Sequence, residues 1–365
     1  MRKIRILIVD DSTVVRRLLS DVLASDPVVE VAGTAANGRL ALAKIPRLNP
    51  DVVTLDIEMP DLDGLATLRE LRKIHPRLPV IMFSTLTERG AVATLDALAL
   101  GANDYVTKPA NVGSVIAGMQ AVRDSLIPKI KGLCSWFAAA PAPTPTVAAV
   151  RRDSRSSFST KISRRRVEIV VIGTSTGGPN ALGEVLSQFP ADFPVPVVVV
   201  QHMPPVFTRH LAARLDQSCR LHVQEGRPLE SLESGDVWIA PGDYHLTAVR
   251  QAGKTFLKTN QESPENSCRP AVDVLFRSVA EAYGPSALAV VMTGMGCDGL
   301  RGCEAIRTAG GRVIVQDEAS SVVWGMPGAV ASAGLADRVL ALPRLAAQIV
   351  ADVEESRTRT LARMS

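Results

Sequence analysis

The chain has 365 residues, of which 46% are hydrophobic and 21% charged, and its formal net charge is +4 at pH 7. A domain typically takes about 150 residues, so this length favours two domains, and the composition excludes both a single small module and a wholly disordered chain. The charge is too small to indicate nucleic acid as a partner, and apolar runs such as residues 195–200 are far shorter than the roughly 20 residues that span a bilayer.

The amino-terminal residues show no signal-peptide pattern, so we expect a cytoplasmic protein without membrane insertion. The five cysteines are odd in number and include no CxxC pair. This spacing argues against a disulfide framework and against a structural zinc site. We expect reduced thiols.

Short apolar strands alternate with helical patterns in residues 1–125. Val15, Leu18, Leu19, Val22 and Leu23 fall on one face of a helix, and the strands are expected at residues 4–9, 51–55, 80–83 and 105–107. This alternation predicts an α/β domain with a doubly wound parallel sheet covered by helices on both faces.

Composition changes between residues 138 and 163, which mix Ala, Pro, Ser, Thr and Arg without an apolar period. We interpret residues 126–166 as an interdomain linker. Its basic side chains indicate a solvated segment, although contact with phosphate or an acidic partner is the alternative.

The strand and helix alternation resumes in residues 167–352, with buried strands expected at 168–172, 195–200, 287–292 and 312–315. A second doubly wound domain is predicted, followed by a tail at 353–365. Residues 236–243 and 244–249 resemble a β-hairpin, which would give this sheet an antiparallel edge.

Polar residues follow four of the strands in the first domain: Asp10, Asp11, Asp56, Ser84 and Lys108. Carboxyl ends of parallel strands share one edge of a sheet, where ligands bind in open α/β folds. Each Asp alone would equally suit a helix cap. Three carboxylates together repel one another, and Mg²⁺ with its preference for oxygen ligands would relieve that repulsion.

With these motif residues, the first 120 residues or so resemble the response-regulator receiver family. The resemblance implies a flavodoxin-like fold in which Asp56 accepts a phosphoryl group. It also implies that Asp11, Asp56 and the backbone carbonyl of Glu58 hold Mg²⁺, with Asp10 in support.

The same resemblance implies a phosphorylation-dependent switch. Ser84 and Lys108 would contact the phosphoryl group, and Tyr105 would be the aromatic side chain that moves when Ser84 is drawn in. The charge gained by an acyl phosphate is physically sufficient to shift a hydroxyl and a ring.

Residues 168–179, EIVVIGTSTGGP, run from a buried strand through glycines into a helix. Their core, Gly173-Thr-Ser175-Thr-Gly177, matches the G-x-S-x-G turn that lifts a serine hydroxyl above a sheet. A phosphate-binding loop or a plain strand-to-helix turn would give the same pattern. The serine therefore needs a partner base.

The chain has five histidines: His75, His202, His210, His222 and His245. Only His202 directly follows a buried strand of the second domain. His75 lies in the other domain, His210 is expected at a helix surface, and the last two have no catalytic context. His202 is therefore the candidate base.

Asp298 follows another buried strand, within MTGMGCDG. It would equally cap the next helix. With Ser175 and His202 it completes a triad in which His202 takes the serine proton, Asp298 holds the imidazolium, and glycine-loop amides receive the oxyanion. The order Ser, His, Asp differs from that of α/β-hydrolases, so that fold is not implied.

The second domain closely resembles the catalytic domain of the chemotaxis protein-glutamate methylesterase family, CheB. The matching stretches are GTSTGGP, VQHMPPVFTRHLAARL, WIAPGDYHL, CRPAVDVLF, MTGMGCDG and EASSVVWGMP. The resemblance assigns Ser175, His202 and Asp298 as the triad, Met295 as an oxyanion contributor through its amide, and Thr176 with Met295 as flanking the substrate ester. One departure is Cys297, where related sequences often carry Asn.

The combined resemblance implies a phosphorylation-activated hydrolase for sensory adaptation in chemotaxis. It would cleave methyl esters from receptor glutamates, releasing methanol, and deamidate some receptor glutamines. The implied partners are methyl-accepting chemotaxis receptors and a chemotaxis histidine kinase, with Mg²⁺ at the receiver, no cofactor for the esterase, and a monomeric chain. The unphosphorylated receiver would inhibit by covering the catalytic edge.

Two other functions are alternatives to this one. A transcription factor would need a short helix-turn-helix output with a basic recognition helix, whereas this output has about 190 residues of strands and glycine loops. A silent adaptor would retain receptor binding alone, which the presence of all three triad residues disfavours.

Overall fold

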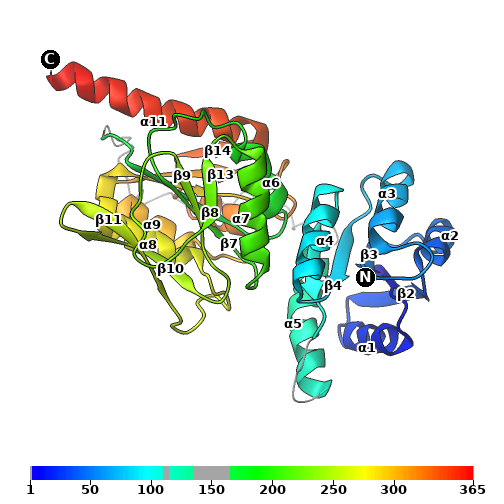
Figure 1. The fold of residues 1–365 in the computed structure, drawn as a ribbon. Helices are drawn as coiled ribbons and strands as arrows, with labels where there is room; N and C mark the ends of the chain where they lie inside the picture. Colours follow the sequence, from blue (N-terminus) through cyan, green and yellow to red (C-terminus); the bar gives the residue numbers. More distant parts are fainter. Residues whose placement is uncertain (1, 110–114, 135–164, 365) are drawn as a thin grey trace, which may run out of the picture.

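Two α/β units, each built on a parallel sheet, form the protein. The computed structural model describes residues 2–109, 115–134 and 165–364. Figure 1 shows the amino-terminal unit, blue to cyan, beside the carboxy-terminal unit, green to red, with α4 and α5 on the side that faces α7. The expected fold class is confirmed.

The amino-terminal unit, which we call the receiver unit, has five parallel strands in the order β2-β1-β3-β4-β5. Every residue of β3 and β4 is buried, which explains why most of their residues are apolar on both faces. Side-chain oxygens cap the starts of α1 to α4. Its elements are β1 Ile4–Val9, α1 Thr13–Ala24, β2 Val29–Ala35, α2 Gly38–Leu48, β3 Val52–Asp56, α3 Gly64–Ile74, β4 Val80–Ser84, α4 Glu88–Ala99, β5 Asp104–Thr107 and α5 Val115–Leu133.

The carboxy-terminal unit, which we call the catalytic unit, has seven parallel strands in the order β14-β13-β12-β6-β7-β9-β8. The first strand, β6, lies between β12 and β7. Later strands are therefore added first on one side of β6 and then on the other, and ligands bind at such a switch point in open α/β sheets. The elements of the parallel core are β6 Ile169–Thr174, α6 Gly178–Leu186, β7 Val197–Gln201, α7 Phe207–Ser218, β8 His222–Glu225, β9 Asp236–Ile239, α8 Val272–Tyr283, the 3-10 turn η2 Gly284–Ser286, β12 Ala287–Val291, α9 Leu300–Thr308, β13 Arg312–Gln316, α10 Met326–Ser332, β14 Arg338–Leu340 and α11 Leu342–Met364.

The expected hairpin pairs differently. Its first strand, β9, lies inside the parallel sheet between β7 and β8. Its second strand, β10 His245–Gln251, pairs instead with β11 Lys254–Asn260, and the two form a separate antiparallel sheet. The large sheet therefore has no antiparallel edge among the described residues.

Two expected boundaries fall inside helices. The boundary at 125 lies within α5, which continues to Leu133 and packs Leu126 and Ile130 into the receiver core. The boundary at 353 lies within α11, where Val353 is buried and the Ser356 hydroxyl accepts a hydrogen bond from the Val167 amide at 3.0 Å. The rest of the expected linker, residues 135–164, lies outside the described residues.

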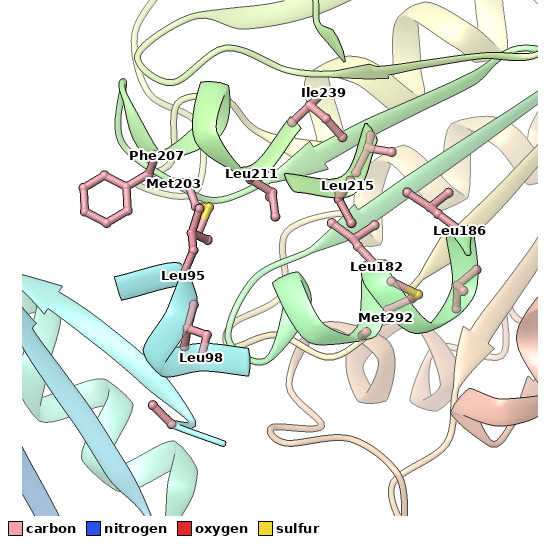
Figure 2. Close-up of a cluster of buried hydrophobic side chains, with 14 of the residues drawn as sticks. Leu95, Leu98, Leu182, Leu186, Met203, Phe207, Leu211, Leu215, Ile239 and Met292 are labelled. Atoms are coloured by element: carbon pink, nitrogen blue, oxygen red, sulfur yellow. The ribbon is translucent and has the colours of Figure 1, made fainter. Parts of the chain in front are cut away.

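The two units share a buried apolar contact. Figure 2 shows Leu95 and Leu98 of α4 beside Phe207 and Leu211 of α7, and all four are at most 4% exposed. We call these four residues the interdomain cluster. It holds the receiver unit against the face of the catalytic unit where α6 and α7 lie.

Candidate active site

Ser175 lies at the turn between β6 and α6. Its amide donates to the Thr293 carbonyl at 3.0 Å, which ties this turn to the end of β12. Gly177 has φ of 78°, a left-handed conformation that favours glycine. At Gly294, a Cβ would lie 2.9 Å from the Ser175 Cβ, so only glycine allows the two loops to approach this closely.

His202 directly follows β7, whose Gln201 pairs with Thr174 of β6. The ends of β6 and β7 therefore bring His202 beside the Ser175 turn. The backbone amide of His202 donates a hydrogen bond to the Thr174 carbonyl at 3.2 Å. The His202 Nε2 contacts Asp298 Oδ2 at 2.7 Å. The structure thus brings together the three expected residues at the ends of neighbouring strands.

Asp298 is 2% exposed and is surrounded by donors. Its carboxylate accepts hydrogen bonds from the amides of Val272, Asp273 and Gly299 and from the side chain of Asn266, at 2.7 to 3.0 Å. Burial alone would raise the pKa of Asp298, but the bonds from His202 and these amides lower it below its usual value. The residue is therefore an ionised, fixed acceptor.

Cys268 occupies the other side of the imidazole. Its Sγ lies 3.6 Å from His202 Nδ1. Burial alone would lower the pKa of His202, but its contacts with Asp298 and Cys268 raise that pKa to about 10. Within the described part of the chain, the Ser175 hydroxyl makes no hydrogen bond. In this conformation the Cys268 thiol, and not the Ser175 hydroxyl, contacts Nδ1 of His202.

Sequence reasoning missed Cys268 because it ends no strand. The thiol singled out from sequence, Cys297, is exposed, whereas Cys268 is half-buried beside the imidazole. The CRPAVDVLF stretch offered one signal, since it begins at Cys268 and its Val272 and Asp273 amides hold Asp298.

Two residues expected to flank the substrate ester are Thr176 and Met295, and the first of them contacts the receiver unit. Thr176 is buried, and its hydroxyl donates to Asp104 Oδ2 at 2.5 Å. Met295 is half-buried, and among the described residues its amide donates to no protein acceptor. That amide is free to bind an oxyanion.

The receiver site brings two buried carboxylates and one lysine together. Lys108 Nζ lies 2.8 Å from Asp56 Oδ2 and 3.2 Å from Asp10 Oδ2. Burial raises the pKa of Asp56 to about 6, although the Lys108 contact opposes that shift. Ligand atoms of Asp10, Asp11 and Asp56 all lie within 4.8 Å of one another. Three carboxylates against one lysine suit a hard divalent cation.

Of the other expected receiver residues, Ser84 is buried and its hydroxyl contacts Thr94 of α4 at 2.8 Å. The Tyr105 ring stacks on Phe207, with 4.8 Å between the ring centroids and 5° between the planes. The Glu58 side chain is exposed in the loop after Asp56. Tyr105 thus joins the receiver unit directly to the catalytic unit.

No helix in the described ranges is long and apolar enough to cross a membrane.

Comparison with known proteins matches two family models. Residues 6–120 match the response regulator receiver domain and residues 170–349 match the CheB methylesterase. A protein-glutamate methylesterase/protein-glutamine glutaminase of Trichodesmium erythraeum is 53% identical over 352 residues, which is 96% of this chain and 99% of that protein. One from Nocardioides sp. is 53% identical over 350 residues, which is 96% of this chain and 95% of that protein.

Among solved structures, the Thermotoga maritima CheB methylesterase catalytic domain is similar to the catalytic unit. The TM-score is 0.50 with 44% identity, covering 50% of this chain and 97% of that one.

Proposed function

The chain belongs to the CheB family of protein-glutamate methylesterases/protein-glutamine glutaminases, and on that premise we propose that Ser175, His202 and Asp298 form its catalytic triad. The substrates are methyl esters of receptor glutamates, with receptor glutamines deamidated by the same chemistry. The observation that carries the triad is the 2.7 Å contact of His202 with a fully satisfied, ionised Asp298, beside a serine on the adjoining strand end.

The proposed reaction begins with Nδ1 of His202. Asp298 accepts a hydrogen bond from Nε2–H, and this tautomer leaves Nδ1 as the basic nitrogen once Cys268 no longer contacts it. His202 takes the Ser175 proton as the oxygen attacks the ester carbonyl, and returns it to the leaving methoxide, which departs as methanol. Water then attacks the acyl-serine by the same route, releasing the glutamate carboxylate.

The oxyanion of each tetrahedral intermediate needs preorganised donors. We assign the free amide of Met295 to this role, because the preceding residue, Gly294, allows the loop to approach Ser175 closely. Thr176 would flank the ester after its hydroxyl leaves Asp104. No metal or other cofactor is assigned to this reaction.

At the receiver site, Asp56 is proposed as the phosphoacceptor for a chemotaxis histidine kinase. Asp10, Asp11, Asp56 and the Glu58 carbonyl would hold Mg²⁺, which neutralises charge on the phosphoryl group when bound. Lys108 already lies 2.8 Å from Asp56 and would contact the phosphoryl oxygens, together with Ser84. Ser84 would have to turn from Thr94 to do so.

The unphosphorylated receiver inhibits the catalytic unit, and phosphorylation relieves this inhibition. We propose that the inhibiting contacts are the Asp104–Thr176 hydrogen bond and the Tyr105–Phe207 stack. Both involve β5, whose Tyr105 is the proposed switch residue.

A transcription-factor role is not proposed, because the output is a seven-stranded α/β unit with a hydrolase site. The proposed setting is cytoplasmic, with a monomeric chain that acts on methyl-accepting receptors without entering the membrane and without nucleic acid.

Release of labelled methanol from methylated receptor membranes tests this proposal. The intact chain is expected to release it slowly, and faster with acetyl phosphate and Mg²⁺. Asp56→Asn should abolish the stimulation, and Ser175→Ala the reaction. A fully active Ser175→Ala chain would refute the triad, and an inactive wild-type chain that binds receptors would favour the adaptor.

A further inference from the structure

The cavity between the two units exposes two potential metal ligands on one wall. It has a volume of about 550 Å³, and its lining includes His202 and Cys268 from the catalytic unit and Tyr105 and Lys129 from the receiver unit. The proposed esterase reaction assigns Cys268 no role. Its sulfur and an imidazole nitrogen nevertheless face each other in solvent-accessible space.

The spacing of these two atoms suits a tetrahedral metal. His202 Nδ1 and Cys268 Sγ are 3.6 Å apart. Ligands at about 2.0 Å for nitrogen and about 2.3 Å for sulfur, held at a tetrahedral angle, are themselves separated by roughly 3.5 Å. A zinc ion can therefore lie between them with almost no change in the separation of the two ligands.

The second nitrogen of the imidazole already has the partner that metal-bound histidines use. Such histidines donate the other ring N–H to a carboxylate, which fixes the ring and increases its basicity. Here Nε2 contacts Asp298 at 2.7 Å, and Asp298 is itself held by backbone amides. The orienting half of a carboxylate–histidine–zinc unit is thus preformed.

Other charged groups around the cavity leave the site open to a cation. Asp243 also lines it and is paired with Arg269 at 2.5 Å. Lys129 lies across the cavity and is paired with Asp104 at 2.8 Å. Arg269 and Lys129 are thus each paired with a carboxylate, so neither needs the Cys268 thiolate as its counter-ion, and the thiolate can bind the metal. Water molecules would fill the remaining coordination positions.

We propose that His202 Nδ1 and Cys268 Sγ form a binding site for a thiophilic divalent cation such as Zn²⁺, and that occupancy inhibits the esterase. Binding releases to solvent the thiol proton and any proton on Nδ1, and it withdraws Nδ1, the nitrogen that must take the Ser175 proton. The inhibitory half of this inference rests on the proposed triad, whereas the binding half does not.

Binding is tested on the full chain with Co²⁺ as a spectroscopic substitute for Zn²⁺. A sulfur-to-cobalt charge-transfer band is expected, because thiolate ligation gives one and the receiver carboxylates do not. Cys268→Ser should remove the band and weaken the binding of Zn²⁺ itself at least about tenfold. The matched control is Cys297→Ser, since Cys297 is exposed and does not line the cavity. That variant should keep the band.

Persistence of the band in Cys268→Ser, or its loss in Cys297→Ser, would overturn the site. Inhibition is measured separately, as methanol release without phosphodonor. Zn²⁺ should slow the wild-type chain, a chelator should restore it, and the activity that remains in Cys268→Ser should not respond to Zn²⁺. Binding without inhibition would retain the metal site and contradict the role of Nδ1 as the base.

Discussion

The two ring nitrogens of His202 face groups of different chemistry. Nε2 contacts the ionised Asp298 and Nδ1 contacts the Cys268 thiol, so the ring is held from both sides. Ser175 must compete with this thiol for Nδ1. Activity at this site therefore depends on how tightly a neighbouring side chain holds the base, as well as on the presence of the three triad residues.

Loss of the nucleophile or of its base should give similar defects. Ser175→Ala and His202→Ala are each expected to lower methanol release by at least about 10³-fold, because only binding and oxyanion stabilisation remain. The double variant should be no slower than either single variant, since serine and base act as one unit. Multiplicative losses, measured on chains with unchanged circular dichroism, would contradict the assignment.

Cys268 should set the pH at which the base works. Its contact raises the pKa of His202, and the reaction needs the neutral imidazole. Cys268→Ala is therefore expected to shift the rise of kcat/KM with pH toward lower pH. The pH–rate profile of the wild-type chain, with Cys297→Ser as control, checks this; an unshifted rise would show that the thiol does not affect the base.

Asp56 makes stability depend on pH in a definite direction. Burial raises its pKa from the usual 3.8 to about 6. The folded chain then holds this proton more tightly than the unfolded chain, so stability falls as pH rises from 3.8 to about 6, by about 3 kcal/mol at most. Asp56→Asn should thus stabilise the metal-free protein at neutral pH.

Urea unfolding in the presence of chelator measures this effect. The gain should shrink as pH falls through about 6, because Asp56 then becomes neutral in the folded wild-type chain. Asp11→Asn serves as the control, since Asp11 is exposed. A gain that stays constant with pH would mean that Asp56 is not the titrating group.

At the scale of elements, α4 and α7 hold the two units together. The ion pairs between α4 and α7 lie largely at the surface: Arg214 pairs with Asp96 at 2.6 Å, and Glu88 contacts Arg209 and His210. Exposed pairs of this kind contribute about 0–1 kcal/mol each. A buried leucine contributes more than such a pair, so we expect the interdomain cluster to stabilise the docking more than the ion pairs between α4 and α7 do.

Leu95→Ala should therefore raise basal activity. Leu95 is 4% exposed in the interdomain cluster, and Val92 on the same helix is 45% exposed and provides the matched control. Loss of about 1–3 kcal/mol of docking energy would increase methanol release without phosphodonor roughly 5- to 150-fold. Equal basal rates for Leu95→Ala, Val92→Ala and wild type would show that this contact does not inhibit.

At the scale of the whole molecule, most residues of both sites could be predicted because they follow the carboxyl ends of parallel strands, which share one edge of a sheet. Buried apolar runs indicated the strands, and parallel strands bring their carboxyl ends to one edge, so Asp10, Asp56 and Lys108 meet, as do His202 and Asp298. The resemblance to known families supplied the roles of these residues. The triad and switch roles stay predictions for the variants above.

Features that depend on tertiary packing could not be predicted in this way. The sequence of residues 236–249 resembles a hairpin, but β9 pairs with β7 and β8 in the parallel sheet instead. Cys268 lies on a loop whose path no periodicity specifies. The Tyr105–Phe207 stack joins two separate domains and has no signal in either pattern.

The direct test of autoinhibition is the rate of methanol release before and after the chain is cut between the two units. A protease site placed within residues 135–164 allows the same preparation to be assayed intact, cut, and intact with acetyl phosphate and Mg²⁺. Cutting removes the tether that keeps the receiver unit at high effective concentration, so dilution should free the Ser175 site. We predict that the cut and the phosphorylated samples are both faster than the intact one, by roughly 5- to 150-fold. Equal rates for the cut and the intact unphosphorylated chain would contradict inhibition by the docked receiver.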